Sequence, residues 1–425
     1  MAGKYQSLRG FRDLLPGETE HWQRFEVEAR QILRSYALRE IRVPHLEATE
    51  LFTRSVGEAT DIVGKEMFSF DAGESSVSLR PEMTAQVCRA YIQHGFDRRG
   101  LQRLYYIGPA FRKERPQKGR LRQFHQIGVE VFGESSPASD AEIMALGIEI
   151  VRAAGVDQTR LLINSIGDVT TRPAFRAALI EALHPVHDKL CADCQDRLQR
   201  NPLRVLDCKK SGCQELSAAA PSILDFLSVP AREHFDEVLA QLDRLGIDAV
   251  VEPRLVRGLD YYVHTTFELR AEGLGAQNTV LGGGRYDGLV RALGGGEVSG
   301  MGWAAGIERL FIAAGLDDRP RDAELDVYLV TLGDVAGAQA LSRVQALRRA
   351  GLAVGWDSAR HGLGGQMKRA GRSGARWAIL LGDDELARGR ATIKDLKSGE
   401  QSEAPIDAEA LSAWMAEHTE KEGRA

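Results

Sequence analysis

The sequence predicts a multidomain chain of α+β and α/β type, in which a sheet-containing domain carries a helical insertion and is followed by a small α/β domain. Three observations support this: strand patterns flank a basic turn at residues 104–133, helical patterns fill residues 171–241, and apolar runs alternate with amphipathic stretches after residue 325. The 425 residues, 43% hydrophobic and 27% charged, have an ordinary globular composition. We expect one domain over residues 1–320, with the insertion inside it, and a second over residues 325–425.

Helix and strand signals alternate in the first part of the chain. Between His21 and Tyr36 apolar side chains recur at mostly helical spacing, which predicts an amphipathic helix. The segment from Ile41 to Pro44 predicts a strand that ends at the proline, because proline cannot donate to a strand ladder. Two further strands are predicted from Leu104 to Lys113 and from Gln123 to Gly133.

Alternation sorts the side chains of these two strands into faces. Alternate apolar residues from Ile127 to Val131 share one face, so Gln126 and Glu130 project from the other. Arg112 and Glu114 likewise share a face of the preceding strand. Antiparallel pairing could bring all four polar groups over one sheet surface, which few purely structural sheets would tolerate. The pattern therefore predicts a binding surface.

Strand character resumes after the insertion, from Ala249 to Val256. From Gly300 to Leu310 small residues give way to helical spacing, which places Arg309 on a helix beside a glycine-bounded strand. In the second domain we expect strands at residues 327–331, 352–354 and 377–381, and helices near residues 336–350 and 363–372. This alternation predicts a small parallel or mixed α/β domain.

Basic residues are concentrated in two parts of a chain whose net charge is −5. Between Arg98 and Arg122 nine Lys or Arg oppose one acid, a local net of +8, and between Arg343 and Arg376 eight oppose one acid, a local net of +7. The overall charge argues against a protein that coats nucleic acid along its whole surface, whereas two basic islands favour two separate anionic contacts. For the second island, a solvated helix face fits equally well.

Apolar patterning and cysteine usage indicate a cytoplasmic protein. No apolar run approaches the ~20 residues that a bilayer requires, and the first residues lack a signal core. Five cysteines in a chain of this size do not form a disulfide framework, which fits a reducing compartment.

Four of the cysteines are spaced somewhat like those of a zinc ribbon, as Cys191-x2-Cys194 and Cys208-x4-Cys213. A tetrahedral site would need four thiolates about 2.3 Å from one ion. The second pair is wider than the usual knuckle, so we expect ordinary reduced cysteines and no structural metal.

The usual phosphate-binding motifs are missing from the sequence. It contains no G-x-x-x-x-G-K-[ST] loop, and the run from Gly282 to Gly284 lacks the spacing and the strand-to-helix setting of a Rossmann fingerprint. If a nucleotide binds, arginines must hold it, because guanidinium groups offer paired donors to phosphate oxygens. Arg112, Arg257 and Arg309 are the candidates.

The segment from Arg257 to Glu268 is the most informative, because it puts a cation, a carboxylate and paired tyrosines beside a β-branched strand. It resembles the histidine-binding signature of histidyl-tRNA synthetases, and Leu281 to Leu289 resembles the companion signature that follows it. Phe111 to Glu114 and Gly302 to Arg309 resemble the second and third class II synthetase motifs, and Arg80 to Thr84 extends the likeness.

This resemblance spans most of residues 8–310 and implies the fold. A class II synthetase-type antiparallel β-sheet catalytic domain flanked by helices is expected, rather than a Rossmann fold, with a C-terminal α/β anticodon-binding domain. The family also forms homodimers through a helix-strand-proline motif like that near the N-terminus. It does not depend on a metal at the clustered cysteines.

The resemblance assigns roles in ATP binding. Arg112 should hold the α-phosphate, Glu114 the adenine amino group, and Arg309 should pack on the adenine and reach the terminal phosphate. Arg257 is placed near the α-phosphate, where it can stabilise developing charge, so Arg257 and Arg112 are the expected catalytic residues. The alternative for Arg257 is a salt bridge to Asp260.

For histidine, the expected site consists of Glu82, Thr84, Gln126, Glu130, Tyr261 and Tyr262. Glu82 with Thr84 would hold the amino group, and Glu130 with Tyr262 would bind the ring, although Glu130 could instead form a strand-surface ion pair. Tyr261, like Tyr286, could simply pack in the sheet. A site that hydrogen-bonds both imidazole nitrogens rejects apolar analogues by roughly 10⁴–10⁵, so no editing domain is needed.

The implied reaction joins L-histidine and ATP to give histidyl-adenylate and pyrophosphate, then transfers histidine to the 3′-terminal adenosine of histidine tRNA. Mg²⁺ would accompany ATP, held chiefly by phosphates and water. The tRNA acceptor end would meet the basic turn that contains Arg115, Gln117, Lys118 and Arg120. The C-terminal basic island would meet the anticodon stem and loop.

Two alternatives share the expected catalytic fold. A non-catalytic, synthetase-like, histidine-binding regulatory subunit of histidine biosynthesis would usually lose the phosphate arginines and the C-terminal domain. Here Arg112, Arg257, Arg309 and a tail of about 100 residues are present. A synthetase for another amino acid, such as proline or threonine, would lack the two histidyl signatures.

Overall fold

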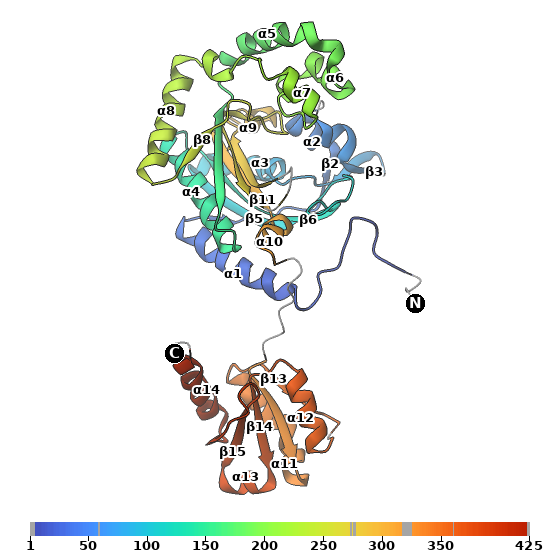
Figure 1. The fold of residues 1–425 in the computed structure, drawn as a ribbon, viewed down its shortest axis with the longest axis vertical. Coiled ribbons are helices and arrows are strands. Elements are labelled where there is room, and N and C mark those ends of the chain that lie inside the picture. Colours follow the sequence, from blue (N-terminus) through green and yellow to red (C-terminus); the bar gives the residue numbers. More distant parts are fainter. Residues whose placement is uncertain are drawn as a thin grey trace. The chain divides into compact units, whose positions relative to one another are not determined.

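The structure, a computed structural model, describes residues 5–57, 60–272, 274, 278–316, 325–359 and 361–422. Within these ranges the chain forms two compact units, a large one that includes His21 to Ala313 and a small one whose first strand begins at Val327 (Figure 1). Among the helices in the described ranges, none combines the length and the apolar character needed to cross a bilayer.

An eight-stranded sheet forms the centre of the large unit, with strand order β1-β5-β6-β11-β10-β9-β7-β8. The strands are β1 (Arg39–Glu40), β5 (Gln102–Phe111), β6 (Gln123–Phe132), β7 (Thr159–Ser165), β8 (Ala249–Val251), β9 (Val263–Ala271), β10 (Thr279–Arg285) and β11 (Gly300–Gly306). The two edge pairs, β1 with β5 and β7 with β8, are parallel, and the inner pairs are antiparallel. The antiparallel sheet expected from the sequence is therefore confirmed.

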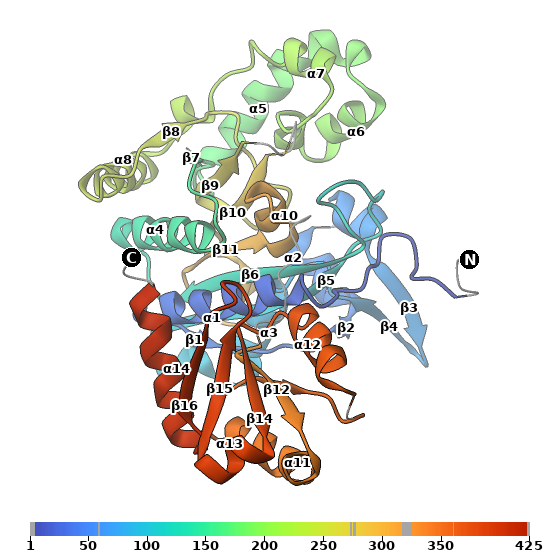
Figure 2. The same cartoon turned by 60° about the horizontal axis from the view of Figure 1, so that its bottom comes forward.

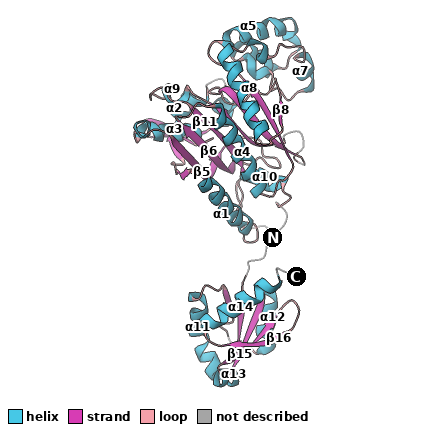
Figure 3. Cartoon of the chain, turned by 90° about the vertical axis from the view of Figure 1, so that its left-hand side faces the viewer, coloured by secondary structure: helices cyan, strands magenta, loops and turns pink. Residues whose placement is uncertain are grey.

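The two faces of this sheet differ in chemistry. Ile127, Val129 and Val131 of β6 are fully buried on one face, as alternation predicts, and burial of each contributes roughly 1.5–3 kcal/mol. Helices on this side are α1 (Thr19–Ser35), α4 (Pro137–Ala153), α8 (Val229–Arg244) and α10 (Ile307–Ala313). Helices on the other side are α2 (Thr49–Val56), α3 (Thr84–Gln93) and α9 (Leu289–Ala292) (Figure 3).

Helices fill the sequence between β7 and β8, but they have two different roles. Helices α5 (Thr171–Leu183), α6 (Ala192–Arg200) and α7 (Ser211–Leu216) are grouped together (Figure 1). Their apolar side chains share a cluster with those of α3. In contrast, α8 packs on the sheet through Phe235, Val238 and Leu242. Because β7 and β8 are parallel, the chain must return along the sheet between them, and α8 makes this crossover.

The strand predicted from Ile41 to Pro44 was wrong in position. The edge strand β1 is Arg39–Glu40, and the Ile41 N–H continues its pairing by donating to the Tyr105 carbonyl at 2.8 Å. The next carbonyls of this segment accept from Arg80 Nη1 at 2.8 and 3.3 Å instead of from a strand, and the proline has no N–H to donate. A separate sheet of order β2-β4-β3 follows, formed by β2 (Leu46–Ala48), β4 (Ser75–Leu79) and β3 (Phe68–Ala72).

The small unit contains a five-stranded sheet of order β13-β12-β14-β15-β16 (Figure 2). Its strands are β12 (Val327–Leu332), β13 (Val354–Trp356), β14 (Trp377–Gly382), β15 (Arg390–Asp395) and β16 (Gln401–Pro405). Its helices are α11 (Asp334–Arg349), α12 (Leu363–Arg372), α13 (Asp383–Arg388) and α14 (Ala408–Glu422). β12 pairs in parallel with β13 and β14, whereas β15 and β16 are antiparallel, so the predicted small α/β domain is of the mixed type.

Truncation of Phe267 should destabilise the large unit. This side chain is fully buried in the apolar cluster between the sheet and α4, so Phe267→Ala should lower the free energy of unfolding by about 3–5 kcal/mol. The matched control is Phe70→Ala, since Phe70 is 48% exposed. Urea unfolding followed by tryptophan fluorescence, to which the buried Trp22 and Trp303 of this core contribute, measures both. Equal losses for the two variants would contradict the proposed core.

Candidate active site

A cleft of about 650 Å³ lies over the polar face of the main sheet. Its walls come from β6, β9, β10 and β11, from the turn after β5, and from the segment between α6 and α7. The polar side chains that line it include Glu82, Thr84, Tyr106, Arg112, Glu114, Arg120, Gln126, Arg257, Tyr261, Tyr262, Glu268 and Arg309. Most of the residues that the sequence predicts for a site therefore meet in one place.

Strand register gives the cleft its floor. Gly128 of β6 lies opposite Tyr106 on one side and Ala304 on the other, and Gly282 of β10 lies opposite Ala304 and Glu268. Directly opposed residues of antiparallel strands point to the same face. Small residues therefore occupy the middle of this row, and Tyr106 and Glu268 stand at its ends.

Arg257 lies flat against this floor. A Cβ on residue 282 would come within 2.3 Å of its guanidinium group, so the glycine provides the space. The guanidinium forms an ion pair with Glu268, and this contact replaces the salt bridge to Asp260 that the sequence left open. Asp260 instead accepts a hydrogen bond from Asn201 Nδ2 at 2.7 Å. Within the described residues, Arg257 Nε is buried without a hydrogen-bond partner.

Three more charged groups, Arg112, Glu114 and Arg120, line the cleft beside the basic turn. Arg112 Nε donates to the Pro81 carbonyl at 2.9 Å. Glu114 accepts from Arg120 Nη1 at 2.7 Å, and its second oxygen lies 3.8 Å from Arg112 Nη1. Arg120 thus turns inward towards Glu114, whereas Arg115, Gln117 and Lys118 are exposed on the same turn.

Arg309 projects from the first turn of α10 into the cleft. Its Nε donates to the Thr279 carbonyl at 2.9 Å, which fixes the plane of the guanidinium. Burial lowers the pKa of Arg309, and the nearby Arg120 lowers it further. An anion that enters beside Arg309 would oppose both effects, because a nearby opposite charge favours the charged form of the guanidinium.

Glu82 and Gln126 form a second polar region of the cleft. The Glu82 carboxylate accepts from the backbone N–H groups of Thr84 at 2.7 Å and Ala85 at 3.0 Å, at the start of α3. Burial raises its pKa, while these hydrogen bonds act in the opposite direction. Within the described residues, Gln126 Oε1 is buried with no hydrogen-bond partner, although Gln126 lines the cleft. A buried acceptor left in this state is suited to a donor on a ligand.

Glu130 is buried beside the cleft, on the same face of β6 as Gln126. It is 1% exposed and accepts hydrogen bonds from Thr84 Oγ1 at 2.6 Å, from the Tyr106 hydroxyl at 3.3 Å, and from the Tyr286 hydroxyl. Burial raises the pKa of Glu130 to about 8, against the effect of these hydrogen bonds. At neutral pH the carboxyl group is therefore mainly protonated. The surface ion pair considered from the sequence is wrong.

The tyrosines divide between the cleft and the buried residues beside it. Tyr261 and Tyr262 both line the cleft, with ring centroids 4.7 Å apart. Tyr286 is 1% exposed and packs against them, 5.8 Å from the Tyr261 ring. Of the two tyrosines that the sequence could not assign, one therefore faces the cleft and the other is part of its support.

Sequence reasoning missed Glu268 and Tyr106. Glu268 ends the signature that begins with Arg257, but the irregular segment between them hides the fact that the two meet. Tyr106 carries no distinctive signal in the sequence of its strand. Only Gly128, which lies opposite Tyr106 in β6, indicates that the tyrosine ring lies across the neighbouring strand. A Cβ on Gly128 would come within 2.3 Å of that ring.

Comparisons with known proteins agree with this geometry. The family model described as Histidyl-tRNA synthetase matches residues 10–310, and that described as Anticodon binding domain matches residues 326–416. The histidine–tRNA ligase of Synechococcus elongatus is 51% identical over 398 residues, covering 93% of this chain and 92% of that protein. That of Geobacillus thermodenitrificans is 48% identical over 425 residues, 98% of this chain and 99% of that protein. The crystal structure of apo S. aureus histidyl-tRNA synthetase matches with TM-score 0.80 and 37% identity, over 97% of this chain and 99% of that one.

The antiparallel sheet and its arginine-lined cleft define the large unit as a class II aminoacyl-tRNA synthetase domain. The small unit carries the matching anticodon-binding fold. More narrowly, the chain belongs to the histidyl-tRNA synthetase family, and the resemblance drawn from its motifs is confirmed.

Glu130 should make the stability of the protein depend on pH. Its folded-state pKa of about 8 lies above the ordinary carboxyl value of about 4.3, so the folded chain holds this proton more tightly than the unfolded chain. Stability relative to Glu130→Gln should therefore fall as pH rises from about 5 to about 8, by up to about 1.4 kcal/mol per pH unit, and then level off.

Urea unfolding of both proteins across this range measures the effect. Glu134→Gln is the control, because hydrogen bonds from the Ser136 backbone lower the pKa of Glu134 and leave it ionised throughout. If the difference in the free energy of unfolding between wild type and Glu130→Gln stays constant with pH, Glu130 is already ionised in the folded protein.

Proposed function

We propose that the chain is a histidine–tRNA ligase that activates L-histidine with ATP and transfers it to the 3′-terminal adenosine of histidine tRNA. The observation that carries this proposal is the cleft in which Arg112, Arg257 and Arg309 line the same space as the polar region of Glu82 and Gln126. Three guanidinium groups suit a triphosphate, and the adjoining polar region suits a small amino acid.

The arginine-rich side of the cleft is proposed as the ATP site. Arg112 contacts the α-phosphate, Glu114 the adenine amino group, and Arg309 the adenine face and the terminal phosphate. In support, Glu114 lies between Arg112 and Arg120, and Arg309 is anchored by Thr279. Mg²⁺ accompanies ATP through phosphate and water oxygens, since Glu114 and Glu268 are already paired with arginines.

Arg257 is the proposed catalytic cation, together with Arg112. As the histidine carboxylate attacks the α-phosphorus, negative charge grows on the phosphate oxygens, and a guanidinium held in place beforehand stabilises it without reorganisation. Glu268 and the glycine floor hold Arg257 in one plane. The Arg204 Nη1 group also donates to the Arg257 carbonyl at 2.8 Å, which fixes the backbone of the segment.

Histidine recognition is assigned to the polar region and its support. Glu82, Thr84 and Gln126 would bind the amino group, and the unpaired Gln126 oxygen supports this assignment. Glu130, with Tyr261 and Tyr262, would bind the imidazole. A neutral carboxylic acid can both donate and accept, so a protonated Glu130 suits the two-sided hydrogen bonding of an imidazole ring.

The remaining assignments concern the tRNA and the assembly. Residues 1–320 would act as the catalytic domain and residues 325–425 as the anticodon-binding domain, with the helical insertion at about residues 171–241. The exposed Arg115, Gln117 and Lys118 would contact the tRNA acceptor end together with Arg120. We place the enzyme in the cytoplasm as a homodimer. The regulatory-subunit alternative is not favoured, because relatives about 50% identical over most of the chain are named histidine–tRNA ligases.

Pyrophosphate–ATP exchange without tRNA tests the activity and its specificity. The purified protein, assayed with each standard amino acid in turn, should catalyse exchange with histidine alone. Exchange driven by another amino acid would overturn the assignment of the polar region. Histidine binding with no exchange would favour the regulatory subunit.

Replacement of Arg257 separates catalysis from binding. Arg257→Ala should lower the rate of adenylate formation roughly 10²–10³-fold while histidine affinity changes little, because the lost contact matters most in the transition state. Gly282→Ala should act in the same direction, since its Cβ would displace the guanidinium. The control is Arg54→Ala, a 65% exposed arginine of α2. Equal losses in rate and in histidine affinity for Arg257→Ala would argue against the catalytic role.

A further inference from the structure

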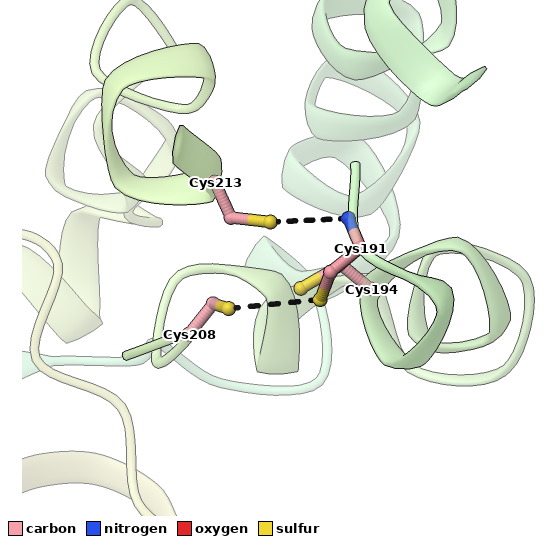
Figure 4. Close-up of side chains that lie close together, drawn as sticks. All are labelled: Cys191, Cys194, Cys208 and Cys213. Atoms are coloured by element: carbon pink, nitrogen blue, oxygen red, sulfur yellow. Dashed lines mark hydrogen bonds between the residues drawn. The ribbon is translucent and has the colours of Figure 1, made fainter. Parts of the chain in front are cut away.

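The four clustered cysteines meet at one point in the helical segment, although three separate stretches of chain carry them. Cys191 precedes α6 and Cys194 lies in its first turn, Cys208 follows the short helix η4 (Pro202–Val205), and Cys213 lies in α7. All four sulfur atoms lie within 4.8 Å of one another. Figure 4 shows the four side chains directed towards a common centre.

The spacing of these sulfurs approaches that of a tetrahedral thiolate site. Zn–S bonds of about 2.3 Å place the sulfurs of such a site about 3.8 Å apart. The Cys191 and Cys208 sulfurs are 4.0 Å apart, and no pair in the group exceeds 4.8 Å. A contraction of at most about 1 Å per pair would close the site around one ion. The space between the sulfurs suits a single metal and is too small for a cluster of several irons with bridging sulfides.

Backbone geometry explains how Cys208 and Cys213, which are separated by four residues, both reach the cluster. Cys208 ends a turn in which its N–H donates to the Val205 carbonyl at 3.1 Å, and α7, which begins three residues later at Ser211, brings Cys213 back beside it. The Cys191 N–H donates to Cys213 Sγ at 3.2 Å. Such hydrogen bonds to sulfur stabilise thiolate ligands in metal sites. The spacing argument that favoured ordinary cysteines in the sequence therefore loses its force.

Four ordinary thiols explain this arrangement less well than a metal site does. Cys88 shows what a single structural cysteine looks like here: it is fully buried among apolar side chains of α3. By contrast, the other four converge on each other, in a region of short helices joined by turns. Short, loop-rich segments of this kind are commonly held together by a metal or by disulfides.

We propose that Cys191, Cys194, Cys208 and Cys213 bind one Zn²⁺ ion as a closed structural site. All four ligand positions come from the protein, so no position remains for water or substrate. Binding displaces the proton from each thiol that is protonated, and each sulfur donates an electron pair to the ion. Tetrahedral coordination by four thiolates favours zinc over harder cations.

The proposed site has a structural connection to the cleft. The segment from Leu206 to Lys209, which contains Cys208, lines the cleft directly. A few residues earlier, Arg204 donates to the Arg257 carbonyl. A metal that joins α6, this segment and α7 would hold one wall of the cleft next to Arg257.

Metal analysis of the full-length protein tests the proposal. The protein, expressed with zinc in the medium and purified with a reductant but no chelator, should contain one zinc per chain by elemental mass spectrometry. Cys213→Ser should reduce the zinc content to background, whereas the matched control Cys88→Ser should retain one zinc. The measurement needs no enzymatic activity, so its outcome is independent of the proposed function.

A second readout does not depend on how the variants fold. Zinc should be released in proportion to thiols modified when the wild-type protein is titrated with a mercurial reagent, and Co²⁺ substitution should give the visible bands of tetrahedral thiolate coordination. Wild-type protein that contains no zinc would overturn the proposal, whether its four cysteines are reduced thiols or disulfides. Iron in place of zinc, or zinc that Cys213→Ser retains, would also overturn it.

Discussion

A sheet can carry buried polar side chains on one face only if its neighbouring strands leave room for them, and in the large unit glycine provides that room. A Cβ would come within 2.3 Å of the Tyr106 ring at Gly128, within 2.1 Å of the Glu130 carboxyl at Gly302, and within 2.3 Å of the Arg257 guanidinium at Gly282. At each place a Cβ would collide with the polar group and displace it from the face of the sheet. The positions of Tyr106, Glu130 and Arg257 on that face all depend on this one steric condition.

Burial of these polar groups is costly unless each is neutralised or paired, and the structure uses both solutions. Arg257 is paired with Glu268, whereas Glu130 keeps its proton and is surrounded by hydroxyl groups. A further buried network holds the elements behind the site, where Asp140 of α4 accepts from Arg285 of β10 and from His234 Nε2 of α8 at 2.9 Å. Charges fixed in this way are already oriented when substrate arrives, which is the condition for electrostatic catalysis.

Much of this could be predicted from sequence because the relevant signals are local. Alternation along residues 123–133 separates the apolar face of β6 from the polar one, and the histidyl signatures identify the family. Contacts between distant segments carry no such signal: the pairing of Arg257 with Glu268 depends on the path of an irregular segment. Likewise, β16 (Gln401–Pro405) lacks apolar alternation, since it is an edge strand whose side chains are mostly exposed, and it escaped prediction. The position of β1 was missed because Arg80 takes the carbonyls that would have extended it.

The crossover between β7 and β8 has a consequence for how such chains can diverge. Helix α8 contributes Phe235, Val238 and Leu242 to the core of the sheet, so its length and register are set by the strands that it joins. Helices α5 to α7 pack instead in the cluster that includes α3, and the segment between α6 and α7 lines the cleft. Insertions and deletions can therefore accumulate at exposed positions between these helices, such as Asp188 and Lys189, while the sheet and the wall of the cleft are preserved. Such surface positions allow members of the family to differ in length without rebuilding the large unit.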